Sequence, residues 1–183
     1  HMEKIRVGMI GFGSRGYGLL KSVVLPRENV VVTAVCDAYP DRAERAADAV
    51  EAAGGARPFV TTEYREVTCR SDVDAVVIAS AWESHIEIAI DAMEHGKYTA
   101  TEVGGAYSVA DCFRLVEAYE RTGMHCMMLE NCCYDRRELM VTRMVREGLF
   151  GEIVHCAGGY QHDLRDEITF GEENRHYRLR NYL

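Results

Sequence analysis

Short apolar runs alternate with segments of helical periodicity along most of the chain. Residues 5–10 and 30–36 are apolar and rich in β-branched side chains, which predicts two buried strands. Between them, residues 15–24 carry leucines and valines at helical spacing, and Pro26 follows as a stop signal. The chain therefore begins with a strand, a helix and a second strand.

The same alternation continues up to residue 129. Further helices are predicted over residues 40–53, 86–96 and 108–122. Further strands are predicted over residues 58–60, 74–80, 97–101 and 125–129. Ser108, followed three residues later by Asp111, predicts an N-terminal cap for the last of these helices. About six strands separated by helices predict an α/β fold, a doubly wound parallel sheet of the Rossmann NAD(P)-binding type.

The pattern changes after the last of these strands. Asp135 and Glu138 predict the start of another helix, and residues 152–160 predict one more strand before a polar, arginine-rich end. A single strand leaves its edges unpaired. We therefore expect a dinucleotide-binding domain over residues 1–131, with residues 132–183 holding the crossover helix, the first strand and the tail of a second α+β domain. Such a chain is the front portion of a longer design, or a partner chain supplies the missing sheet, and self-association through the last strand is expected.

Composition excludes several classes of protein. With 48% hydrophobic residues, 27% charged residues and 3 Pro, the chain is neither disordered nor collagen-like. The 21 Lys and Arg against 29 Asp and Glu give a net charge of −8, and no basic block interrupts it, so a nucleic-acid partner is not expected. No apolar run approaches the roughly 18 residues of a membrane span, and no signal-peptide layout is present.

The 7 cysteines are odd in number and include no Cys-x-x-Cys pair. This spacing favours neither a disulfide framework nor a zinc site, and no other metal site is suggested. A reducing, cytoplasmic environment fits best.

The hexapeptide GFGSRG directly follows the first predicted strand and opens the first predicted helix. In that context Gly11 permits the tight turn, Gly13 lets the backbone approach a pyrophosphate, and Gly16 lets the helix pack closely on the strand. Ser14 and Arg15 lie at the helix N-terminus, whose free N–H groups attract phosphates. These five residues predict a dinucleotide site.

Asp37 lies 21 residues after Gly16, at the end of the second predicted strand. A carboxylate at this place accepts hydrogen bonds from an adenosine ribose and repels a 2′-phosphate, so NAD is favoured over NADP. Arg15 and Arg42 soften that repulsion, which keeps NADP as the weaker alternative.

Four stretches of the chain resemble the glucose-fructose oxidoreductase, inositol dehydrogenase and MocA superfamily. They are residues 11–16, 82–85, 94–102 and 147–154. The resemblance implies a nucleotide-binding domain followed by a mostly antiparallel sheet, which forms the substrate site and often the oligomer interface. It also implies that further substrate-binding groups lie in that sheet, so this chain alone is expected to turn over poorly or not at all.

Within the superfamily, the dehydrogenases usually carry Glu-Lys-Pro where this chain has Glu102-Val103-Gly104, and Val103 cannot transfer a proton. The chain is more similar to the NAD-dependent α-N-acetylgalactosaminidase-like glycoside hydrolases. That similarity is carried by residues 101–103, 130–134, 158–163 and 177–180. It implies a glycosidase that keeps NAD tightly bound as a transient hydride acceptor: the sugar is oxidised at C3, the leaving group is eliminated, water adds, and the ring is reduced again.

The resemblance also implies roles for single residues. Tyr160 is the candidate base, because a phenol beside a cationic nicotinamide has its pKa lowered, and His162 is a candidate to bind substrate or relay a proton. Packing of Tyr160 on a neighbouring domain and simple exposure of His162 remain the alternatives.

Four more candidates follow predicted strands, where open α/β sheets place their ligands. Trp82 and His85 are expected to flank the nicotinamide, and Glu102 to contact the nicotinamide ribose or the sugar. Glu130 is the candidate substrate contact. The alternatives are a capping role for His85 and a capping or surface role for Glu102.

Three classes of function stay open at this point. The first is an NAD-using glycosidase, and the second is a conventional NAD(P)-dependent sugar or polyol dehydrogenase with a base other than lysine. The third is a truncated nucleotide-binding module without catalysis. NADH accumulates on addition of sugar only in the second class.

Overall fold

The computed structural model describes residues 4–159, 161–165 and 175–177 of the 183-residue chain. The chain divides into two compact units, His1–Leu129 and Glu130–Leu183. Each unit has its own internal contacts.

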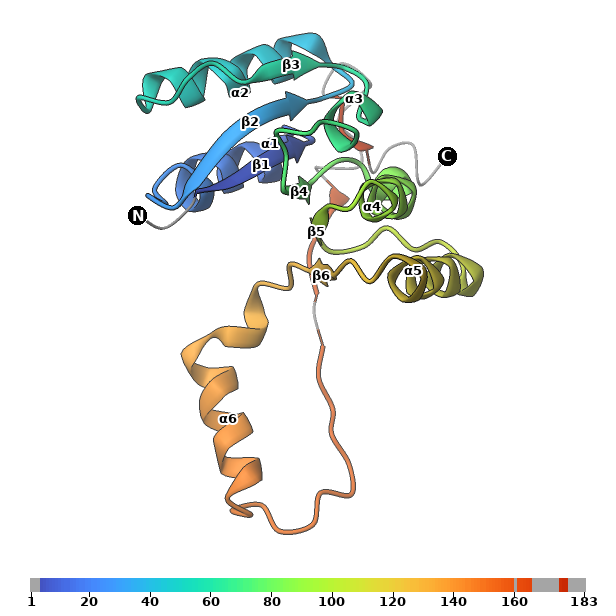
Figure 1. Cartoon of the computed structure of the whole chain (residues 1–183). Helices are drawn as coiled ribbons and strands as arrows, with labels where there is room; N and C mark the ends of the chain where they lie inside the picture. Colours follow the sequence, from blue (N-terminus) through green and yellow to red (C-terminus); the bar gives the residue numbers. More distant parts are fainter. Residues whose placement is uncertain (1–3, 160, 166–174, 178–183) are drawn as a thin grey trace. The chain divides into compact units, whose positions relative to one another are not determined.

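The described part of the first unit is built on one six-stranded parallel sheet, with the order β3-β2-β1-β4-β5-β6 (Figure 1). The strands are β1 (Ile5–Ile10), β2 (Val30–Cys36), β3 (Phe59–Thr61), β4 (Ala75–Ile78), β5 (Tyr98–Thr101) and β6 (Cys126–Met128). The chain order reverses between β1 and β4, and ligands bind at such a switch point in open α/β sheets. The predicted doubly wound parallel sheet is confirmed.

Helices connect all of these strands. They are α1 (Ser14–Leu19), η1 (Leu20–Val24), α2 (Pro40–Ala52), α3 (Arg65–Thr68), η2 (Trp82–Ser84), α4 (His85–Glu94) and α5 (Val109–Thr122). The helix predicted over residues 15–24 is present, but its second half, η1, is a π-helix. The α3 helix was not predicted, because its four residues are too few to show a helical period.

The core lies on both faces of the sheet. On one face, Val7 and Met9 of β1 pack with Leu20 and with Val50 of α2. On the other face, Ile10 and other strand residues pack against α3 and α4, and α5 lies beside α4 (Figure 1). Because both faces are covered, the strands are continuous apolar runs rather than alternating ones.

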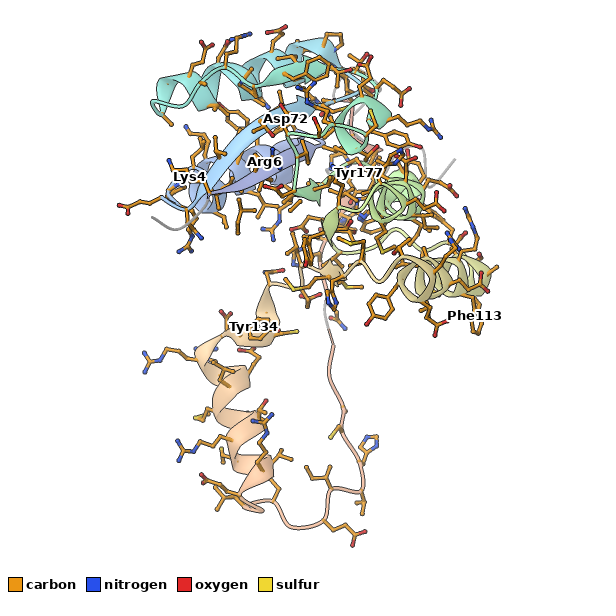
Figure 2. All side chains as sticks on the ribbon, in the orientation of Figure 1. Lys4, Arg6, Asp72, Phe113, Tyr134 and Tyr177 are labelled. Carbon is orange, nitrogen blue, oxygen red and sulfur yellow. The ribbon has the colours of Figure 1, made fainter. Side chains whose placement is uncertain are left out.

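The α5 helix has the predicted terminal signals. The Ser108 hydroxyl accepts a hydrogen bond from the backbone N–H of Asp111 at 3.1 Å, and Gly123 ends the helix in the left-handed conformation with φ +69°. One face of α5 is exposed: Phe113, labelled in Figure 2, has 64% of its surface accessible, and Val109 has 73%.

The second unit contains η3 (Cys132–Tyr134) and α6 (Arg136–Arg146). Asp135 occupies the N-cap position that precedes α6, as predicted, although its side chain makes no capping hydrogen bond. The strand predicted over residues 152–160 is wrong: residues 152–159 have no regular structure, and residue 160 lies outside the described ones. A strand needs a hydrogen-bonded neighbour, and no described segment pairs with this one; Val154 is 89% exposed. Self-association through residues 152–160 stays a prediction.

Candidate functional site

The glycine-rich turn lies at the carboxyl ends of β1 and β4. Gly11 has φ +95°, and a Cβ atom on it would lie 2.3 Å from the backbone nitrogen of Ser80. A Cβ atom on Gly16 would lie 1.9 Å from the carbonyl oxygen of Gly11. Both positions therefore require glycine, for the tight turn and for the close packing that the sequence predicts.

Gly13 differs from Gly11 and Gly16 because the position that a Cβ atom would occupy on it, called here its open side, faces free space. Apart from its chain neighbours, the one heavy atom of the described residues that lies within 4 Å of a Cβ built there is Nη1 of Arg42, at 3.9 Å. Beside the turn is a hollow of about 430 Å³, whose lining includes Gly13, Ser14, Arg42 and Arg45. This is the kind of backbone cradle that a phosphate can approach closely.

Asp37 joins the end of β2 to the glycine-rich turn. Its side chain is buried, with Oδ2 accepting a hydrogen bond from the Phe12 N–H at 2.6 Å and Oδ1 accepting one from the Tyr39 N–H at 2.9 Å. A carboxylate has about four acceptor positions, so each oxygen can accept one more bond from a ribose hydroxyl. Asp37 can thus shape the turn and bind a ribose at once.

An ion pair spans the carboxyl edge of the sheet. Nε of Arg15 donates to Oε1 of Glu102 at 2.9 Å, and the Glu102 side chain is only 12% exposed. Arg15 lies in the first turn of α1, after β1, and Glu102 follows β5, with β4 between those strands in the sheet. The pair therefore crosses the switch point where a dinucleotide is expected. The sequence predicts both residues as cofactor contacts but not their pairing.

His85 is 1% exposed and has a protein partner at each ring nitrogen. Its Nε2 lies 2.9 Å from the carbonyl oxygen of Ser80, and its Nδ1 lies 3.3 Å from the Thr101 hydroxyl. A carbonyl oxygen only accepts, so Nε2 carries the proton and donates it. This geometry favours a supporting role beneath the site, tying the loop after β4 to the end of β5, over the predicted direct contact with the nicotinamide.

Two glycines at the carboxyl edge of the sheet, which the sequence analysis does not predict as site residues, approach the predicted site residues Trp82 and His85 closely. Gly104 has φ +93°, and a Cβ on it would lie 2.7 Å from Nε1 of Trp82; Gly105 has φ +100°, and its Cβ would lie 2.4 Å from Cβ of His85. Glycine alone tolerates both the conformation and the contact. The signal was the Gly-Gly pair that follows Glu102.

Three predicted site residues belong to the second unit. Oε1 of Glu130 accepts a hydrogen bond from the Cys132 N–H at 3.5 Å, and His162 is exposed. Tyr160 lies outside the described residues. The catalytic and substrate-binding roles of these residues stay predictions.

The described residues hold no cluster of three or more His, Cys, Asp or Glu side chains that could bind a metal ion. None of their helices combines the length and the apolar character needed to cross a bilayer. Cys36 is buried next to Asp37, and burial raises the pKa of its thiol to about 12, which keeps it protonated.

Comparison with known proteins agrees with this fold. Residues 5–130 match the model of the oxidoreductase family with an NAD-binding Rossmann fold, Gfo/Idh/MocA. The chain belongs to the Gfo/Idh/MocA family. The predicted family and the NAD-binding fold are thereby confirmed, and residues 134–179 also match the model of the glycosyl hydrolase 109 C-terminal domain.

Relatives of this Gfo/Idh/MocA chain are glycosyl hydrolases. A glycosyl hydrolase family 109 protein of Shewanella woodyi is 43% identical over 90% of this chain and 36% of its own length. An α-N-acetylgalactosaminidase of Shewanella oneidensis is 42% identical with the same coverage. The chain thus spans about a third of the length of the curated relatives it matches.

Among solved structures, scyllo-inositol dehydrogenase of Lactobacillus casei with bound NAD(H) and scyllo-inositol superposes with a TM-score of 0.74. The alignment covers 82% of this chain and 43% of the dehydrogenase at 17% identity, so it shows the shared fold. NAD fits the site on the structure's own terms, since the open side of Gly13 provides the cradle and Asp37 retains acceptor positions.

Proposed function

We propose that this chain is the nucleotide-binding part of a glycoside hydrolase that retains NAD as a transient hydride acceptor. The observation that carries the proposal is the end of β5. Glu102 is paired with Arg15, and the next three residues are Val103, Gly104 and Gly105, none of which can transfer a proton. A dehydrogenase that uses a lysine at this place does not fit.

The similarity of residues 134–179 to the glycosyl hydrolase 109 C-terminal domain supports the same proposal. An α-N-acetylgalactosaminidase among the relatives suggests an N-acetylated sugar glycoside as the substrate class. Bound NAD would supply reversible hydride acceptance, which acidifies the proton next to the oxidised carbon of the sugar.

The chain's own residues would do the remaining work. Gly13 would admit the pyrophosphate, and Asp37 would accept hydrogen bonds from the adenosine ribose. Glu102 would orient the nicotinamide ribose or the sugar once Arg15 has moved to a phosphate. Tyr160 would take a proton from the sugar, with His162 as a relay or substrate contact.

Seven unpaired cysteines fit a reducing compartment, which supports a cytoplasmic location for this function.

The test has two parts: one sample of the purified chain is denatured and any released nucleotide is identified, and a second, native sample is supplied with a nitrophenyl α-N-acetylgalactosaminide. We expect about one NAD per chain, no exchange with added NAD on the time scale of purification, and slow nitrophenol release without NADH absorbance. NADH that accumulates with sugar would favour a conventional dehydrogenase. An empty chain that also fails to bind added NAD would leave only a scaffold without chemistry.

A further inference from the structure

Two adjacent cysteines near the start of the second unit take part in no step of the proposed reaction. Cys132 and Cys133 are the first two residues of η3. Both are free thiols with exposed side chains, although free cysteines are among the residues most often buried. Packing in a core therefore does not account for this pair. Cys69, Cys112 and Cys156 are also exposed, but none of these three has a cysteine next to it in the chain.

One of the two adjacent sulfurs has a hydrogen-bond donor directed at it. Nδ2 of Asn131 donates to Sγ of Cys132 at 3.6 Å. The nucleophile in thiol–disulfide exchange is the thiolate. A donor beside a sulfur assists this attack, because a hydrogen bond to a charged acceptor is stronger than one to a neutral acceptor. This contact favours Cys132 as the attacking residue and leaves Cys133 to complete the exchange.

We propose that Cys132 and Cys133 form a dithiol site that reacts reversibly with small-molecule disulfides. The Cys132 thiolate attacks one sulfur of the reagent, forms a mixed disulfide with it and releases the other half of the reagent as a thiolate. The Cys133 thiolate then attacks Sγ of Cys132, which closes a disulfide between the two residues and releases the second half. The pair loses two electrons and two protons, and the reagent disulfide is reduced to two thiols.

Adjacency makes the second step intramolecular and its product easy to reduce. The Cα atoms of neighbouring residues are about 3.8 Å apart, whereas those joined by a disulfide are usually about 4.4–6.8 Å apart. The closed pair is therefore strained, and strained, exposed disulfides are the labile ones. In a reducing compartment the pair is present as two thiols, and an excess of a small-molecule disulfide closes it.

The experiment treats the native, fully reduced 183-residue chain with an excess of glutathione disulfide, alkylates the remaining thiols and analyses the peptides by mass spectrometry. We expect the peptide that contains Cys132 and Cys133 to lose two hydrogen atoms and to carry no glutathione. Cys69 and Cys112 are the internal controls, because each is exposed without a neighbouring thiol and should carry one glutathione. Dithiothreitol should restore both thiols of the pair. The exchange needs neither NAD nor sugar, so its failure is distinguishable from failure of the proposed function.

Two variants test the order of the steps. Cys133→Ser should stop at a glutathione on Cys132, because the second thiol is missing. Cys132→Ser should take up glutathione on Cys133 several-fold more slowly, because the Asn131 amide donates to the sulfur of Cys132. Both substitutions change exposed side chains, so the melting temperature should be unchanged. Equal rates in the two variants would overturn Cys132 as the attacking residue.

Three results with the wild-type chain would overturn the dithiol site itself. One is a glutathione on each of Cys132 and Cys133, and another is a pair that stays unmodified while Cys69 and Cys112 react. The third is a disulfide from either residue to Cys126, which lies in the same stretch of chain and is partly buried. Fragment ions of the peptide distinguish that bond from the expected one.

Discussion

Removal of the Asp37 carboxylate should destabilise the first unit even when no nucleotide is present. The two backbone N–H groups of Phe12 and Tyr39 donate to it at 2.6 and 2.9 Å. In Asp37→Ala both donors lose their acceptor in a place where Asp37 is only 6% exposed. The variant therefore tests whether this carboxylate supports the glycine-rich turn as well as binding a ribose.

The magnitude follows from the two lost hydrogen bonds. A buried donor left unsatisfied costs about 1–3 kcal/mol, and because the Tyr39 N–H is only partly buried, the two donors together cost at most about 2–6 kcal/mol. Water that enters the space left by the side chain recovers part of this, and we expect a loss of about 2–4 kcal/mol in the free energy of unfolding. In a chain of this size that loss lowers the melting temperature by roughly 5–15 °C.

The assay is urea unfolding of the nucleotide-free chain, because bound nucleotide would add its own stability. Trp82 is the chain's single tryptophan and lies in the first unit, so its fluorescence reports the unfolding of that unit. Asp48→Ala is the control: the Asp48 side chain is 70% exposed and paired with Arg57, and its loss should change stability by less than about 0.5 kcal/mol. An Asp37→Ala chain as stable as this control would refute the supporting role.

Three other outcomes follow from the same contacts. Gly13→Ala should keep the wild-type melting temperature but bind NAD at least about tenfold more weakly, whereas Gly11→Ala, at φ +95°, should lose stability first; calorimetry and thermal melts together separate the two. Lys97→Met should cost about 1–3 kcal/mol in urea unfolding, because the 8%-exposed Lys97 ammonium donates to two backbone carbonyls that would then be unsatisfied; an unchanged midpoint would contradict this. Hydrogen bonds from Arg6 lower the pKa of Asp74, so the ionised Asp74 stabilises the folded chain above the ordinary pKa of 3.8, and this stabilisation is lost as the pH falls through the lower, folded-state pKa. In urea unfolding, Asp74→Asn should therefore be less stable than the wild type at pH 7 and should lose less stability than the wild type on acidification.

Local sequence signals determined most of the fold. The apolar runs that became β1, β2 and β4 and the periodic segments that became α2, α4 and α5 were predicted within a few residues of their observed bounds. The requirement for glycine at Gly11 and Gly16 was also predicted. These features depend on backbone conformation and on burial over a few consecutive residues, and a short stretch of sequence encodes both.

The strand predicted over residues 152–160 shows what local sequence signals cannot determine, namely whether a strand finds a hydrogen-bonded neighbour. Its residues have strand character, yet a strand forms only when a neighbour supplies hydrogen bonds, and no described segment does so for residues 152–159. The sequence likewise could not show η1 to be a π-helix rather than an α-helix.

The pairing of side chains was decided by the tertiary structure alone. Arg15 and Glu102 are 87 positions apart in the chain and meet only because β4 places β1 and β5 on either side of it. His85 is predicted to lie at the nicotinamide, and the sequence does not show that Gly105 and the Thr101 hydroxyl approach its side chain so closely that it is 1% exposed. The sequence thus identified which residues gather at the carboxyl edge of the sheet. Which of them pair with each other, and which face a ligand, depends on distances that only the folded sheet sets.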